Sequence, residues 1–203
     1  MSERRDYLGP YERATERHGA GFESLLWASP ATQEARFQAI TRLVNLRRKR
    51  VLDVGCGRAD FLDYLVRRKV KVTSYVGIEG VAALAEVACE KGAGVARIVQ
   101  GDFLANPELL ETGAQVVVIS GALNTMDAEG FYSTLRRAYG AAEEALVFNF
   151  LCSSRLAGAD YLSWHPVEEV MGFARTLSDR VRKLEDYLVG DCTVMIGKKG
   201  KDE

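Results

Sequence analysis

Two kinds of apolar pattern alternate along the chain after residue 49. Five runs are nearly continuous stretches of Val, Ile, Leu and aromatic residues, whereas three other segments space their apolar residues three and four apart. Continuous runs are typical of strands buried on both faces, and the wider spacing is typical of helices that cover a sheet. The strand runs are 50–55, 72–79, 96–102, 114–121 and 144–150, and the helical segments are 59–69, 81–92 and 128–142. The pattern predicts a doubly wound α/β fold.

The C-terminal part of the chain follows a different pattern. After a helical segment at 167–177 come two strand-like segments, 180–189 and 192–199, with only Gly190-Asp191 between them. So short a link cannot hold a crossover helix, so we expect an antiparallel hairpin. The predicted fold class is therefore α/β, with a doubly wound, mostly parallel seven-stranded sheet, a C-terminal antiparallel β-hairpin and an N-terminal helical cap.

The first 48 residues form that cap. Segment 29–44 begins with Ser29 as a plausible N-cap and Pro30 at the first helical position, which predicts a helix packed on the sheet. Its apolar stripe consists of Phe37, Ile40 and Val44. Segment 9–29 mixes charges with Tyr11, Phe22 and Trp27, a composition that suits a cap over a ligand. We expect one domain over residues 1–203, divided into a cap segment (1–48) and a Rossmann-like core (49–199).

Composition narrows the classes of partner. The chain of 203 residues has 27 Lys+Arg against 28 Asp+Glu, a net charge of −1, so no overall field attracts nucleic acid or anionic lipid. The basic clusters 47–50 and 67–69 each follow a helical pattern, where cations complement the helix dipole. The N-terminal sequence lacks a signal-peptide core, and no apolar run approaches the roughly 18 residues of a membrane span. We expect a cytoplasmic protein that binds no membrane, and the neutral charge disfavours a nucleic-acid partner without excluding one.

The cysteines predict neither a disulfide framework nor a metal site. The four cysteines form no CxxC pair, and the chain has two histidines. Structural zinc needs more ligands at close spacing, so we expect no metal. The cysteines are Cys56, Cys89, Cys152 and Cys192.

The segment "VLDVGCGRADF" at 51–61 contains the most informative motif. A strand that ends in Gly55-Cys56-Gly57 and leads into a helix brings bare backbone against a nucleotide-like ligand. Dinucleotide-binding proteins have a third small residue where this chain has Asp60. Asp60 and Asp53 would repel a pyrophosphate, so the motif favours a ligand with positive charge.

At these residues the chain resembles the class I S-adenosylmethionine (SAM)-dependent methyltransferases, over about residues 50–199. Their first motif runs acidic-x-Gly-x-Gly, and later acidic residues end the second strand and follow the third. The resemblance implies that the ribose lies at Glu79 and Gly80 and the adenine at Asp102 and Phe103. It places the methionine end of the cofactor at Asp53, Gly55, Cys56, Gly57 and Asp60.

The end of the fourth predicted strand, "VVVISGALNTM", lies in that family beside the methyl group to be transferred. The resemblance therefore makes Ser120 and Gly121 backbone contacts and Asn124 a substrate-side residue, although Asn124 is equally explained as a helix cap. Segment 27–37 is similar to a bacterial subgroup of uncharacterised class I enzymes, in which Gln33 or Arg36 would meet the methionine carboxylate. Arg36 as an exposed helix residue is the alternative.

The long loop after the fifth strand predicts a wall for a substrate pocket. It contains Arg155, Tyr161, Trp164 and His165, and His165 is a weak candidate for a general base. His165-Pro166 is also a plain turn into a helix. Packing at the loop edge explains Tyr161 and Trp164 more readily than acceptor stacking does. Methyl transfer proceeds in line and does not always need a base, so alignment alone can supply much of the rate.

The sequence favours a SAM-dependent methyltransferase that acts on a small molecule and releases S-adenosylhomocysteine (SAH). One alternative is a protein that binds SAM or SAH without turnover. Another is an NAD-dependent oxidoreductase, which Asp60 disfavours. The absence of an Asn-Pro-Pro-aromatic motif argues against adenine and glutamine amino methyltransferases. The acceptor atom and the oligomeric state are left open.

Overall fold

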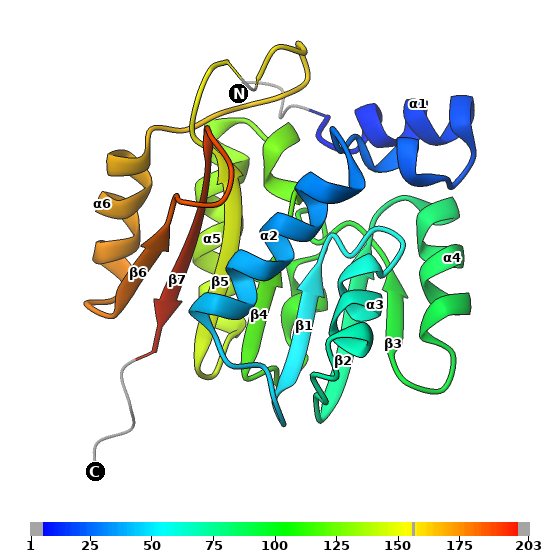
Figure 1. Cartoon of the computed structure of the whole chain (residues 1–203), viewed down its shortest axis with the longest axis horizontal. Helices are drawn as coiled ribbons and strands as arrows, with labels where there is room; N and C mark the ends of the chain where they lie inside the picture. The colour runs from blue at the N-terminus through cyan, green and yellow to red at the C-terminus, as the bar shows by residue number, and fades with distance from the viewer. Residues whose placement is uncertain (1–5, 156, 199–203) are drawn as a thin grey trace.

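The computed structural model describes residues 6–155 and 157–198, and within them seven strands form one mixed sheet (Figure 1). The strands are β1 (Arg50–Val54), β2 (Ser74–Glu79), β3 (Arg97–Gln100), β4 (Val116–Ile119), β5 (Ala145–Leu151), β6 (Val181–Leu184) and β7 (Asp191–Gly197). Their spatial order is β3-β2-β1-β4-β5-β7-β6. Strands β1 to β5 run parallel, and β7 lies antiparallel between β5 and β6. The predicted fold class is confirmed.

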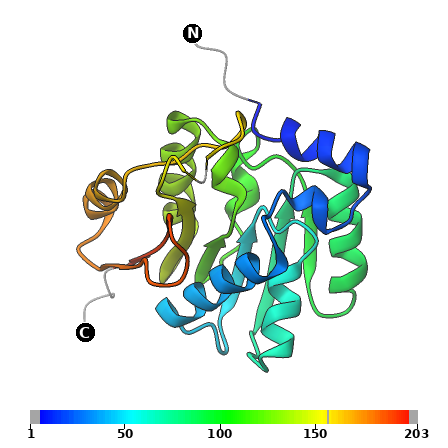
Figure 2. The same ribbon diagram turned by 45° about the horizontal axis from the view of Figure 1, so that its top comes forward.

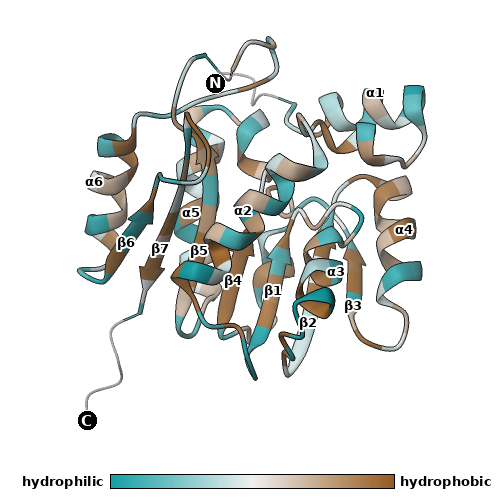
Figure 3. Ribbon diagram, in the orientation of Figure 1, coloured by the Kyte–Doolittle hydropathy of each residue, from teal (hydrophilic) through white to brown (hydrophobic). Residues whose placement is uncertain are grey.

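Helices cover both faces of the sheet. They are α1 (Gly9–His18), α2 (Pro30–Leu43), α3 (Asp60–Arg67), α4 (Ala82–Gly92), α5 (Ala128–Ala141) and α6 (Val167–Leu177), with 3-10 turns η1 (Phe22–Leu25), η2 (Pro107–Leu110) and η3 (Ala122–Thr125). Helices α2, α3 and α4 contribute to one buried cluster, and α5 and α6 to the other. Figure 3 shows the brown, apolar strands between helices that turn teal residues outward.

Helix α2 begins where the sequence predicts. The Ser29 hydroxyl accepts a hydrogen bond from the Thr32 backbone N–H at 3.2 Å, and the Thr32 hydroxyl accepts from the Ser29 N–H at 3.1 Å, which completes a capping box. Phe37 and Ile40 are buried as predicted, but Val44 is the C-cap, and Leu43 completes the buried stripe. Helix α2 is thereby fixed on the sheet.

The predicted two-residue link in the terminal hairpin is wrong. Strand β6 ends at Leu184, and residues 185–190 connect it to β7. In the connecting segment, Asp186 forms an ion pair with Arg42 of α2 at 2.9 Å, and the Tyr187 hydroxyl donates to Asp191 at the start of β7. Polar contacts with another element thus replace the strand pairing that the apolar pattern suggested.

The N-terminal cap lies across the carboxyl ends of the strands. Figure 1 shows α1 above β2 and β3, and in the tilted view of Figure 2 α1 and η1 cover that edge of the sheet. Residues 1–5 of the predicted cap segment, and the predicted core boundary at residue 199, lie outside the described residues. Within the described ranges, no helix has the length and apolarity needed to cross a bilayer. The cytoplasmic location stays a prediction.

Candidate functional site

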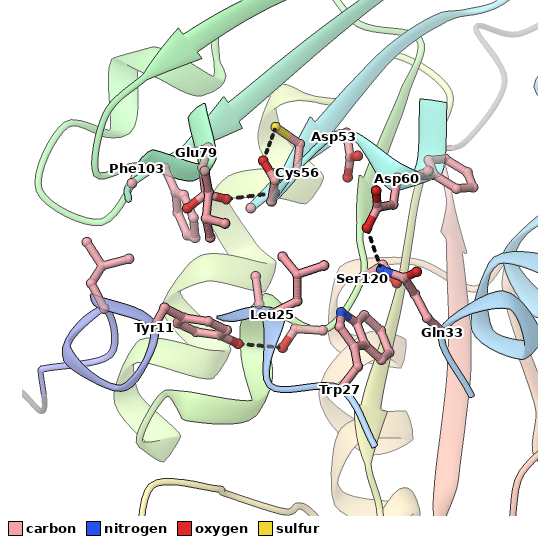
Figure 4. A pocket seen from close by; sticks show the side chains of 18 of the residues that line it. Tyr11, Leu25, Trp27, Gln33, Asp53, Cys56, Asp60, Glu79, Phe103 and Ser120 are labelled. Atoms are coloured by element: carbon pink, nitrogen blue, oxygen red, sulfur yellow. Dashed lines mark hydrogen bonds between the residues drawn. The ribbon is translucent and has the colours of Figure 1, made fainter. Parts of the chain in front are cut away.

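A cavity opens between the strand ends and the cap, at the point where the strand order reverses between β1 and β4. This switch point is where open α/β sheets bind ligands. The core residues that line it are Asp53, Gly55, Cys56, Gly57, Asp60, Phe61, Glu79, Gly80, Leu84, Phe103, Ser120, Gly121 and Ala122. The cap and α2 contribute Tyr7, Leu8, Tyr11, Leu25, Trp27, Gln33 and Phe37. Figure 4 shows the carboxylates on one side of the cavity and Tyr11, Leu25 and Trp27 on the other.

The turn after β1 needs glycine for steric reasons. Gly55 has φ +70° and Gly57 φ +55°, in the left-handed region that side chains disfavour. A Cβ on Gly55 would lie 2.4 Å from the Cβ of Ala122 in the neighbouring β4 turn. The two strand-end turns are therefore in direct contact, and bare backbone faces the cavity as the motif predicts.

Asp53 is a buried carboxyl group at the end of β1. It is 2% exposed, and its side chain accepts a hydrogen bond from the Tyr75 hydroxyl. Burial raises the pKa of Asp53 to about 7, with smaller contributions from the charges of Glu79 and Asp60, while the Tyr75 hydrogen bond opposes the rise. A cation in the cavity would stabilise the charged form of Asp53.

Asp60 begins α3 and lines the cavity, but its charge is already shared. Lys91 lies 2.5 Å from Oδ1, and the Gln33 side-chain amide donates to Oδ2 at 3.2 Å. Asp60 therefore links α2, α3 and α4 at the rim, whereas neither Asp53 nor Glu79 forms an ion pair with a residue of 6–155 or 157–198.

Glu79, at the end of β2, connects two turns. Its Oε2 accepts from the Gly57 N–H at 2.7 Å and its Oε1 from the Val81 N–H at 2.9 Å. Burial raises the pKa of Glu79, and these backbone donors limit the rise. Each carboxylate oxygen has a second lone pair, so Glu79 retains acceptor capacity toward the cavity.

Of the two residues predicted to contact adenine, only one lines the cavity. Phe103 lines the cavity, but Asp102 does not. The Asp102 Oδ1 accepts from the Tyr7 hydroxyl at 2.6 Å and the Leu104 N–H at 2.8 Å, and the Tyr7 ring packs against Phe103 at 5.6 Å between centroids. Tyr7 is a cap residue that the sequence interpretation missed, because 95 residues separate it from Asp102.

The turn after β4 is fixed by a residue that the sequence interpretation also missed. Asn149 in β5 is fully buried; its Oδ1 accepts from the Gly121 N–H at 3.1 Å and its Nδ2 donates to the Ser120 hydroxyl at 3.3 Å. Both Ser120 and Gly121 line the cavity as predicted. The only signal for Asn149 was an amide within an otherwise apolar strand.

The weaker substrate and catalytic candidates lie outside the cavity lining. Asn124 is buried and accepts from the Leu151 N–H at 3.3 Å. His165 stacks on Phe131 at 3.9 Å, and burial lowers its pKa. Trp164 is 43% exposed, and Tyr161 lines a separate hollow beside α1.

Of the two α2 residues predicted to meet a carboxylate, the structure brings Gln33 to the cavity. Arg36 is buried and forms an ion pair with the fully buried side chain of Asp191. Its guanidinium group also lies over the Trp27 ring, 4.6 Å from the centroid. Arg36 therefore contacts Asp191 and Trp27, and it is not among the residues that line the cavity.

Solved methyltransferase structures share this architecture at low sequence identity. Magnesium protoporphyrin IX methyltransferase (ChlM) from Synechocystis PCC 6803, with bound SAH, matches with a TM-score of 0.67 and 14% identity over 96% of this chain and 98% of that one. The DhpI–SAH complex matches with 0.67 and 14% over 97% and 96%. An O-methyltransferase family protein from Burkholderia thailandensis matches with 0.67 and 18% over 85% of this chain, which spans 57% of that protein. No protein-family model and no curated protein matches. The chain has the class I methyltransferase fold.

Proposed function

We propose that this protein is a SAM-dependent methyltransferase with a small-molecule acceptor. The observation that carries the proposal is the pair of buried carboxyl groups, Asp53 and Glu79, beside a bare glycine turn at the switch point of the sheet. A ligand with positive charge and a ribose suits that set, because the ammonium group attracts a carboxylate and a diol donates to one. The residues present therefore fit SAM.

Different residues of the cavity would bind different parts of SAM. Asp53 would hold the methionine ammonium group and Gln33 would donate to the carboxylate, with Asp60 supporting Gln33 at 3.2 Å. Glu79 would accept from the ribose hydroxyls, and Phe103 with Leu84 would provide an apolar surface for adenine. When bound, SAM supplies an electrophilic methyl group.

No side chain needs to act as a base at this site. The Ser120 and Tyr11 hydroxyls and the backbone of Gly121 lie at the β4 side of the cavity, where they would orient an acceptor. Alignment for in-line attack can contribute much of the rate. His165 has no part in this proposal because it lies outside the lining.

A small-molecule acceptor is favoured by charge and by the neighbours. The net charge of −1 provides no field for nucleic acid. Two of the fold neighbours are described as a magnesium protoporphyrin IX methyltransferase and a pyocyanin biosynthetic protein. The alternative of a SAM-binding protein without turnover shares the same cavity.

Calorimetric titration with SAM, SAH and NAD⁺ tests the proposal. We expect saturable binding of SAM and SAH and none of NAD⁺, because a pyrophosphate at the glycine turn would face Asp53 and Asp60. An acceptor screen that follows SAH release then separates a methyltransferase from a protein that only binds SAM. Binding of NAD⁺ alone, or of none of the three, would contradict the cofactor assignment.

A further inference from the structure

A second hollow lies on the outer face of α1, next to the cavity; we call it the outer hollow. Its volume is about 190 Å³. The α1 residues in its lining recur every three or four positions and so share one face of the helix. They are Pro10, Arg13, Ala14, Arg17 and His18. The loop that follows β5 passes over the same edge of the sheet as α1 and brings Tyr161 to that face (Figure 1).

The outer hollow and the cavity share a wall. Leu26 lines the outer hollow, whereas the residues on either side of it, Leu25 and Trp27, line the cavity. A single strand of backbone therefore separates the two spaces at this point.

Tyr11 lies between the outer hollow and the turn after β4. Its hydroxyl donates to the Gly121 carbonyl at 3.4 Å. Burial raises the pKa of Tyr11, Glu79 adds to the rise, and Tyr161 contributes a smaller part, so the two phenol groups are close enough to interact. A small molecule that lies along Tyr161 and Tyr11 would reach from the outer hollow to the Gly121 turn.

The outer hollow has an excess of positive charge. Two arginines, Arg13 and Arg17, line it together with His18, and Glu23 is the acidic residue in the lining. Among residues 6–155 and 157–198, the side chains of Arg13, Arg17 and His18 form no hydrogen bond and no ion pair. Each guanidinium group therefore keeps its five N–H donors available for a ligand.

Cations that line two other hollows already have acidic partners. Between α2, α3 and α4, Lys91 lies 2.5 Å from Asp60. At the opposite edge of the sheet, Lys49 lies 2.5 Å from Glu144. The arginines of the outer hollow differ from these lysines because their charge is not matched within the protein, and an anion would match it.

We propose that the methyl acceptor carries an oxyanion group, a carboxylate or a phosphate, that binds Arg13 and Arg17 in the outer hollow while its nucleophile lies at the Gly121 turn. This inference rests on the proposed function. A guanidinium group binds either oxyanion through two parallel, charge-assisted hydrogen bonds. His18 and the Tyr161 hydroxyl would donate further hydrogen bonds to the same group, so the acceptor is a small acid.

A titration with inorganic phosphate and with acetate, followed by NMR at the arginine Nε–Hε groups of the isotope-labelled protein, tests the site. Sodium chloride at matched ionic strength measures screening alone. We expect saturable shifts at Arg13 and Arg17 with phosphate or acetate and none with chloride. The ion that binds more tightly indicates which oxyanion the acceptor carries. In Arg13→Gln, the affinity observed at Arg17 should fall about tenfold, because charge-assisted hydrogen bonds are lost.

The matched control is Arg175→Gln, which removes an equal charge from an exposed position on α6 and should leave the affinity at Arg17 unchanged. Shifts that do not saturate, that chloride reproduces, or that occur with equal affinity at Arg175 would overturn the inference.

Kinetics with any acceptor found by SAH release give a second test, in which the acid is compared with its neutral amide. Arg17→Gln should raise KM about tenfold for the acid with kcat unchanged, because the oxyanion contributes to binding and not to the reacting atoms. The amide should show no such change. An acceptor that reacts equally well as acid and as amide would overturn the inference.

The cofactor assignment is tested separately by calorimetry with SAH. Binding of SAH without shifts at Arg13 and Arg17 would overturn the oxyanion site alone. Shifts at both arginines without binding of SAM or SAH would overturn the proposed function, and with it the role of the site in binding a methyl acceptor.

Discussion

The hydroxyl group of Tyr75 in β2 donates a hydrogen bond to the buried carboxyl group of Asp53 in the adjacent strand β1. This contact satisfies one carboxyl oxygen without supplying a positive charge. Burial still raises the pKa of Asp53 to about 7. Asp53 therefore titrates near neutral pH, and its charge depends on what occupies the cavity.

The affinity for SAM should fall as the pH drops below 7. Protonated Asp53 no longer attracts the ammonium group, so we expect SAM to bind about tenfold more weakly at pH 6 than at pH 8. Calorimetry across this range measures the effect. Asp53→Asn should bind weakly at both values, and an equally steep pH dependence in that variant would assign the titration to another group.

The same variant also has a stability signature. The folded-state pKa of Asp53 lies above its ordinary value of 3.8, so the stability it contributes is present below that value and is lost as pH rises through about 7. At pH 8, Asp53→Asn should therefore unfold at higher urea concentration than the parent while it binds SAM less well.

Asn149 should position the β4 turn without touching the cofactor. Asn149→Leu leaves the Gly121 N–H without its partner, which costs about 1–3 kcal/mol for a buried donor, and lets the Ser120–Gly121 turn move. We expect a lower unfolding free energy and a SAM Kd raised about tenfold. Asn149→Asp keeps an acceptor for Gly121 and should retain more of the affinity than Asn149→Leu does.

Breaking the buried ion pair of Arg36 with Asp191 should lower the unfolding free energy far more than breaking the exposed ion pair of Arg42 with Asp186. Arg36→Met leaves a buried carboxylate without its cation, and we expect a loss of about 3–5 kcal/mol in unfolding free energy. Arg42→Met, on the same helix, should lower the unfolding free energy much less because both partners are exposed. Equal losses in urea denaturation would contradict this difference in burial.

His165 should affect stability and not cofactor binding. Burial holds its pKa below the ordinary 6.5, so the unfolded chain takes up a proton first and stability falls as pH drops below 6.5. The difference in unfolding free energy between His165→Leu and the parent should therefore change between pH 7.5 and 5.5, in favour of the variant at low pH. A loss of SAH affinity in His165→Leu would instead return this residue to the site.

Local patterns predicted the strands, the α2 cap and the glycine turn because each depends on neighbouring residues. The run that ends at Gly55 is a nearly continuous apolar stretch, and Ser29-Pro30 fixes a helix start through contacts three residues apart. The contacts that complete the site join distant segments: Tyr7 with Asp102 over 95 residues and Arg36 with Asp191 over 155. No periodicity encodes such pairs, so the sequence predicted neither of these two contacts.

The position of β7 sets the order in which the chain can finish folding during synthesis. All seven residues of β5 are buried, yet one edge of β5 pairs only with β7, which follows the other described strands in the sequence. Until that strand emerges from the ribosome, the nascent chain exposes an apolar edge that is prone to aggregate. Asp191 is the first residue of β7, so the ion pair of Arg36 with Asp191 forms only after β7 has been made. Because Arg36 lies over the Trp27 ring, the cavity wall at Trp27 is also completed only when translation has passed β7.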